Sequence, residues 1–197
     1  MNMKDKLLFI DTETGGLNPD KHSLLSLAMV VWQNKELIDS QEILIKDGQL
    51  SVTEEALSIN KIDIENHKKL ALPSSQAFER CIKFISQHFP DQKQITLAGH
   101  NVHFDVAFLK VFFSQNNTRF STYFSHRIID TSSILYYLHL AGHLKEKAIS
   151  SDEAFALFNI QVDGRHTALG DAVATAELFN KLLDLTKMWS KSFADIC

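Results

Sequence analysis

The chain has 197 residues, of which 45 % are apolar and 22 % charged, and its formal net charge is −4. This length suits a single domain whose core needs no disulfides. With only Cys81 and Cys197, the sequence excludes a disulfide framework and a CxxC metal site. It contains no apolar run of about 18 residues that could cross a bilayer, and no apolar signal stretch begins the chain. We therefore expect a cytoplasmic protein with no membrane partner.

The charge pattern limits how nucleic acid could be bound. Proteins that follow a long duplex usually carry a basic face, and this sequence has no run rich in Lys and Arg. If the protein binds nucleic acid, we expect it to hold a short stretch, with metal ions supplying much of the positive charge.

The first part of the chain reads as three strands and a hairpin. A short apolar run over Lys6–Asp11 predicts a buried strand that leads to a turn at Gly15 and Gly16. Two further strands are predicted over Leu24–Trp32 and Leu37–Ile45, joined by a turn at 33–35.

Helices and two more strands are predicted in the rest of the chain. The helices are expected at Thr53–Asn60, from Pro73 to before Pro90, and at Phe104–Gln115, Ser132–His143, Ser150–Phe158 and Leu169–Leu183. The strands are expected at Gln94–Gly99 and Arg127–Asp130. This order predicts an α/β fold, a mixed five-stranded sheet flanked by helices, in a single domain over 1–197 with its core at about 7–183.

Asp11 and Glu13 are the first candidate functional pair. They are two residues apart at the end of a predicted strand, so their side chains project to the same face if the strand continues that far. Two such carboxylates ionise together at low cost only if a cation lies between them. The alternative is a solvent-facing strand end with incidental acids.

Two later segments carry further acids and a histidine. Asp105 lies in the first turn of a predicted helix and is aligned with its apolar stripe, although an acid near a helix N-terminus can simply favour the helix dipole. His166 and Asp171 precede and begin the last helix. Five residues correspond to about 140° of rotation, so His166 must lie on the approach loop if it meets Asp171 at one site.

Together these segments resemble the three motifs of the DEDDh 3′–5′ exonuclease superfamily. The matching strings are DTETGGL at 11–17, HNVHFD at 100–105 and HTALGD at 166–171, and the short predicted strand that ends at Asp130 also fits. The resemblance covers about Leu7 to Leu183 and is nearest to the proofreading epsilon subunit of bacterial DNA polymerase III. It implies a ribonuclease H-like fold.

The resemblance also implies a mechanism and its residues. Two divalent ions, Mg²⁺ or Mn²⁺, would be held by Asp11, Glu13, Asp105 and Asp171. These residues and His166, as the general base, would form the catalytic set. Hard cations of this kind favour oxygen ligands, and His has a suitable pKa for a base. The expected product is a nucleoside 5′-monophosphate.

Substrate contacts are implied at five positions. Thr14 and the backbone at Gly15 would meet the terminal nucleotide, Leu17 would wedge between the last two bases, and Phe104 would offer a stacking face. Asn101 would be a further substrate contact. Leu17 and Phe104 could instead belong to the core. Many polymerase-linked members of the superfamily carry a second Thr where this chain has Gly15.

The resulting hypothesis is a metal-dependent 3′–5′ exonuclease on single-stranded or frayed DNA, acting in proofreading or repair. Its expected partners are a nucleic-acid 3′ end and a DNA polymerase subunit. A 3′–5′ exoribonuclease, or an enzyme that degrades short oligonucleotides, is the alternative within the class, since nothing in the sequence reveals a contact to the 2′-OH. A non-catalytic binding module derived from a nuclease is the alternative outside it, and the presence of residues at all five catalytic positions weighs against that reading.

Overall fold

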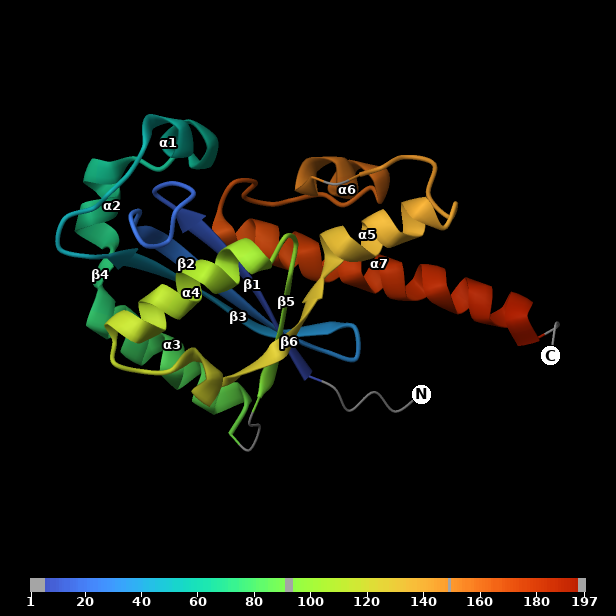
Figure 1. The fold of residues 1–197 in the computed structure, drawn as a ribbon, viewed down its shortest axis with the longest axis horizontal. Helices are drawn as coiled ribbons and strands as arrows, with labels where there is room; N and C mark the ends of the chain where they lie inside the picture. The colour runs from blue at the N-terminus through green and yellow to red at the C-terminus, as the bar shows by residue number, and fades with distance from the viewer. Residues whose placement is uncertain (1–5, 91–93, 149, 195–197) are drawn as a thin grey trace.

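The computed structural model describes residues 6–90, 94–148 and 150–194, with side chains described up to residue 186. These residues form a six-stranded sheet in the order β4-β3-β2-β1-β5-β6 (Figure 1). The strands are β1 Lys6–Thr14, β2 Leu24–Gln33, β3 Glu36–Lys46, β4 Leu72–Pro73, β5 Ile95–Gly99 and β6 Phe124–Asp130. Pairing is antiparallel along β1, β2 and β3 and parallel for β1–β5, β5–β6 and β3–β4.

Helices cover both faces of this sheet. They are α1 Glu54–Asn60, α2 Ile64–Leu70, α3 Ser74–His88, α4 His103–Gln115, α5 Thr131–Leu140, α6 Ser151–Leu157 and α7 Ala168–Ala194, with a 3₁₀ turn η1 at Phe120–Thr122. Helices α3 and α4 pack on one face and the long helix α7 packs on the other (Figure 1). The predicted α/β class with a mixed sheet is confirmed.

The alternation of β1 decides which side chains reach each helix layer. Leu8 and Ile10 belong to the core shared with α3 and α4, whereas Leu7 and Phe9 pack with α7. Because side chains in a strand alternate between faces, Asp11 and Glu13 continue the face that α7 covers. Buried alanines at 168, 172 and 176 allow α7 to lie close to the sheet, which places its first turn near the end of β1.

Some element boundaries differ from the sequence prediction. Five strands were predicted, and the additional one is β4. It was missed because a strand of two residues is too short to show an alternating pattern. Helix α2 was also missed, although Asp63 caps it by accepting hydrogen bonds from the backbone N–H groups of Glu65 and Asn66. Helix α5 ends at Leu140 rather than His143 because Gly142, at a φ of 76°, reverses the chain there.

Strand β6 begins at Phe124, earlier than predicted, because Phe124 is buried and pairs with Ile95. Strand β1 extends to Thr14, three residues beyond the predicted end. This extension keeps Asp11 and Glu13 within the strand, which is the condition under which the two carboxylates share a face.

Candidate active site

Three carboxylates converge where β1 ends and α7 begins. One oxygen each from Asp11, Glu13 and Asp171 lies within 4.8 Å of the others. Asp11 and Glu13 come from alternate positions of β1, and Asp171 comes from the first turn of α7. The predicted meeting of the first and last motifs is therefore present in the fold.

The start of α7 is held in place by its own backbone and by the preceding loop. Thr167 Oγ1 accepts a 3.1 Å hydrogen bond from the Gly170 N–H, and Thr167 O accepts one from the Asp171 N–H. A Cβ at Gly170 would lie 2.3 Å from Gly164 O, so glycine permits the loop to pack against the helix here. These contacts fix the position of the first turn of α7, and so the point along β1 that Asp171 faces.

Asp105 approaches the end of β1 from the other face of the sheet. It is buried in the first turn of α4, and its Oδ1 accepts a 2.6 Å hydrogen bond from Thr12 Oγ1. Its carboxylate lies outside the compact group of three, although its charge raises the pKa of Asp11. Asp105 therefore belongs to the same electrostatic site without joining the three-acid cluster.

Burial and like charge raise the pKa values of these acids. Burial, followed by repulsion from the other acids, raises the pKa of Asp11 well above its usual range. Burial and repulsion from Asp171 raise the pKa of Glu13 to about 8. Burial raises the pKa of Asp105 to about 7 against the opposing hydrogen bond from Thr12. A bound cation would stabilise the ionised form of such closely placed carboxylates.

The donor set fits a hard divalent cation. It offers carboxylate oxygens only, as Mg²⁺ and Mn²⁺ prefer. Asp171 Oδ1 is buried and has no hydrogen-bond partner among the described residues. A buried polar atom of this kind usually has a partner, and a metal ion would supply one.

His166 lies on the approach loop, as the helical geometry required. It precedes α7, is half-buried, and has a left-handed backbone conformation with φ at 64°. Burial raises the pKa of Asp171, whereas the charges of Arg165 and of a protonated His166 lower it. The charge of a protonated His166 therefore acts on Asp171.

Two further charged residues reach the site and were not predicted. Arg165 forms an ion pair with Asp171 and hydrogen bonds to Asp152 and Ser151 of α6, each at 2.9 Å. Its place directly before His166 was the one available sequence signal. Glu42, from β3, adds repulsion that raises the pKa of Glu13, and no periodic pattern marked it.

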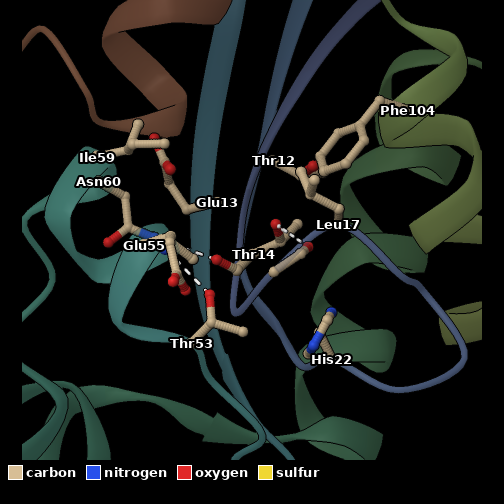
Figure 2. A pocket seen from close by; sticks show the side chains of 12 residues that line it. Thr12, Glu13, Thr14, Leu17, His22, Thr53, Glu55, Ile59, Asn60 and Phe104 are labelled. Carbon is tan, nitrogen blue, oxygen red and sulfur yellow. Dashed lines mark hydrogen bonds between the residues drawn. The ribbon is translucent and has the colours of Figure 1, made fainter.

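A pocket of about 470 Å³ opens beside the acid cluster. Figure 2 shows Phe104 of α4 across this pocket from Ile59 and Asn60 of α1. Leu17 also lines the pocket and is 83 % exposed, so the alternative that it is a core residue is excluded. Phe104 is half-buried, with its ring centroid 5.1 Å from that of Phe108, so it belongs partly to the core and partly to the pocket.

The polar edge of the pocket is formed by the end of β1. Thr14 lines it, donates a 2.9 Å hydrogen bond from Oγ1 to Gly16 O, and accepts one from Asn60 Nδ2 at its own carbonyl (Figure 2). Glu13 also lines it and belongs to the three-acid cluster. The pocket and the cluster are thus continuous through Glu13.

Gly15 and Asn101 are not among the residues that line this pocket. The Gly15 N–H donates to Ser23 O, and Gly15 O accepts from the Thr53 N–H. A Cβ at Gly15 would lie 2.1 Å from Ser51 O, which explains why glycine stands at this position. Asn101 is exposed and donates its backbone N–H to Asp130 Oδ1 at 2.9 Å. Substrate contacts at these two positions stay predictions.

The fold and the acid cluster together define a nuclease of the ribonuclease H-like class. The chain belongs to the RNase T exonuclease family, which it matches over residues 8–179. The prediction of a 3′–5′ exonuclease domain is confirmed at this level, and a nucleic acid is its substrate.

Individual relatives span several kinds of nuclease. The chain is 29 % identical to ribonuclease T of Haemophilus ducreyi, with 90 % of this chain and 86 % of that protein covered. It is 28 % identical to a probable oligoribonuclease of Schizosaccharomyces pombe, over 68 % and 54 % of the two chains. It is 25 % identical to the PolC-type DNA polymerase III of Caldanaerobacter subterraneus, over 99 % of this chain but 13 % of that one.

A solved structure of E. coli exonuclease I with a dT13 oligonucleotide has the same fold. The TM-score is 0.79 at 15 % identity, and the match covers 96 % of this chain and 43 % of exonuclease I. Within the described part of the chain, no helix combines the length and the apolar character needed to cross a membrane.

Proposed function

We propose that this chain hydrolyses single-stranded or frayed DNA from its 3′ end and releases nucleoside 5′-monophosphates. The observation that carries this proposal is the continuity of the apolar pocket with the acid cluster at Glu13. A terminal nucleotide seated in the pocket would present its phosphodiester to the carboxylates. The exposed Leu17 and the half-buried ring of Phe104 offer the kind of apolar surface that unstacked bases contact.

In this proposal Asp11, Glu13 and Asp171 hold divalent cations, Mg²⁺ or Mn²⁺, at the end of β1. Asp105 would contribute to holding a second ion, as the superfamily resemblance implies. When bound, a pair of such ions stabilises the attacking and leaving oxygens of an in-line displacement. The unpartnered Asp171 Oδ1 and the all-oxygen donor set support this assignment.

His166 is proposed as the general base that takes a proton from the attacking water. Its place on the loop beside Asp171, rather than within the three-acid cluster, suits a base better than a ligand. Thr14 would orient the terminal nucleotide from the polar edge of the pocket. Contacts from the Gly15 backbone and Asn101 are proposed on the resemblance alone.

RNA is the second candidate substrate. Ribonuclease T and a probable oligoribonuclease are among the relatives, and their names favour trimming of RNA ends or degradation of short oligonucleotides. The match to a PolC-type polymerase supports the alternative in which the domain proofreads beside a DNA polymerase rather than acting alone in repair.

The test is digestion of four matched oligonucleotides, DNA and RNA, each labelled at the 5′ or the 3′ end, with Mg²⁺ and with EDTA. A 3′–5′ exonuclease shortens the 5′-labelled strand progressively, whereas the 3′-labelled strand releases its label as a mononucleotide at once. Faster digestion of RNA than of DNA would mean that RNA, rather than DNA, is the preferred substrate. Full activity in EDTA would refute the metal assignment.

A further inference from the structure

The Arg165 guanidinium contacts four groups between the acid cluster and α6. Its guanidinium forms an ion pair with Asp171 Oδ2. It also donates from Nε to Asp152 Oδ1 at 2.9 Å and from Nη2 to Ser151 Oγ at 2.9 Å. The same group lies over the buried ring of Phe155, 5.6 Å from its centroid. Four groups therefore fix the guanidinium, and three of them belong to α6.

These contacts divide the two oxygens of Asp171. Oδ2 is held by Arg165, whereas Oδ1 is buried and has no hydrogen-bond partner among the described residues. A carboxylate held by one oxygen cannot rotate freely about its last bond. The free oxygen is thereby presented in one orientation.

We propose that Arg165 is a positioning residue that orients Asp171 for metal binding, with α6 as its anchor. This inference rests on the proposed function, because it assumes that Asp171 is a ligand. Groups that hold a metal ligand from behind commonly change metal affinity about 10–100-fold when they are removed. Arg suits this task because its planar fork satisfies several acceptors in fixed directions, which a Lys ammonium does not.

The opposite role would be a built-in cation that a metal ion must displace. The geometry argues against it, because α6 sets the position of the guanidinium through Asp152, Ser151 and Phe155. These anchors do not depend on the acid cluster. A metal ion can therefore take Asp171 Oδ1 while Arg165 keeps Oδ2.

The two roles predict opposite changes in the affinity of the metal-free protein for Mn²⁺, measured by calorimetric titration. Arg165→Ala is expected to weaken Mn²⁺ binding by about 10–100-fold, and Arg165→Lys is expected to weaken it too, despite the retained charge. Asp152→Asn changes a side chain that is 71 % exposed and lies outside the three-acid cluster, and it should weaken Mn²⁺ binding in the same direction by removing the charge that anchors the guanidinium. Arg80→Ala, on the exposed side of α3, is the control for loss of one positive charge.

A positioning effect should also appear in kinetics. The Mn²⁺ concentration that gives half-maximal turnover should rise in Arg165→Lys, and saturating Mn²⁺ should restore most of the rate. Unchanged or tighter Mn²⁺ binding in both Arg165 variants and in Asp152→Asn would overturn the proposal while leaving the metal site intact. If the unmodified protein fails to bind Mn²⁺, the metal site itself is refuted, and the role of Arg165 is refuted with it.

Discussion

Thr12 Oγ1 donates a 2.6 Å hydrogen bond to Asp105 Oδ1 and so ties the end of β1 to the first turn of α4. Thr12 stands between Asp11 and Glu13 in the sequence, but its side chain faces the opposite side of the sheet. The strand thus presents two carboxylates to α7 and a hydroxyl to α4. This hydrogen bond links an acid from the far face of the sheet to the strand that carries the other two.

Replacing Thr12 by Val should destabilise the protein in a pH-dependent way. The change keeps the shape of the side chain but leaves the buried Asp105 carboxylate without this donor, at a cost of about 1–3 kcal/mol. The cost should be larger at pH 8 than at pH 5, because the bond favours the ionised form of a group whose pKa is about 7. Urea unfolding in EDTA at both pH values measures it. Thr12→Ser keeps the hydroxyl, so equal losses in the two variants would contradict the argument.

Asp11→Asn should have opposite effects with and without metal. In EDTA the variant should melt at a higher temperature than the unmodified protein, because Asn requires neither a buried charge nor the proton uptake that the raised pKa of Asp11 imposes on folding. The unmodified protein should gain about 2.7 kcal/mol, or roughly 5–10 °C, at a metal concentration about 100 times Kd. The variant should lose this gain and the activity. Asp20→Asn, an exposed acid outside the cluster, should keep both, and an equal gain in Asp11→Asn would exclude Asp11 as a ligand.

The metal-free protein should lose stability as the pH rises from about 5 to 8. The pKa values of Glu13 and Asp105 are raised to about 8 and about 7, above their values in the unfolded chain. A group whose pKa is raised by folding contributes stability that is complete below its pKa in the unfolded chain. That contribution is lost as the pH rises through its pKa in the folded protein. Each contributes a slope of at most about 1.4 kcal/mol per pH unit.

Metal binding should reverse this trend, because the cation replaces the protons. The increase in melting temperature on adding Mg²⁺ or Mn²⁺ should therefore be larger at pH 8 than at pH 6. Differential scanning calorimetry over this range, with metal and with EDTA, makes the comparison. A metal-induced increase that does not vary with pH would mean that the acids are already ionised in the metal-free protein.

His166→Asn should reduce turnover by about 10²–10⁴-fold, the usual scale for loss of a general base. Asn is preferable to Ala because His166 has a φ of 64°, a conformation that Asn tolerates and Ala resists. Mn²⁺ affinity should stay close to that of the unmodified protein. If it falls as far as in Asp171→Ala, His166 is a ligand and not the base.

The sequence predicted the parts of the site that local periodicity controls. Alternation along a strand placed Asp11 and Glu13 on one face, and the 140° rotation along a helix placed His166 on the loop. The role of Arg165 could not be predicted, because its contacts to Asp152 and Phe155 depend on how α6 packs against α7. No spacing in the chain encodes that packing.

The packing around Gly15 also could not be predicted from local sequence. Gly15 predicted a turn, and the structure shows in addition that its backbone packs against Ser51, from a loop 36 positions further along the chain. Close approach to a distant segment leaves no local pattern. The exposure of Leu17 likewise depends on α1 and α4 standing apart around the pocket (Figure 2).

The apolar pocket predicts a preference for unpaired 3′ ends. Stacking on protein surfaces contributes about 1–3 kcal/mol per base, which corresponds to about 5–150-fold in rate or affinity. A paired end must first be opened, and a terminal mismatch removes most of that cost. We therefore expect faster digestion of a labelled strand when it is alone or mismatched at its 3′ terminus than when it is fully paired. Initial rates on the three substrates measure the preference.

Leu17→Ala should narrow this preference without weakening Mn²⁺ binding, because Leu17 lines the pocket but lies outside the acid cluster. Leu140→Ala is the matched control, since Leu140 is 68 % exposed on α5 and does not line the pocket. Phe104→Leu, which keeps an apolar side chain for the core, should slow digestion of all three substrates by removing the ring. Equal rates of the unmodified protein on all three substrates would reject the wedge, and faster digestion of the paired end would show that a duplex, rather than an unstacked strand, is what the pocket receives.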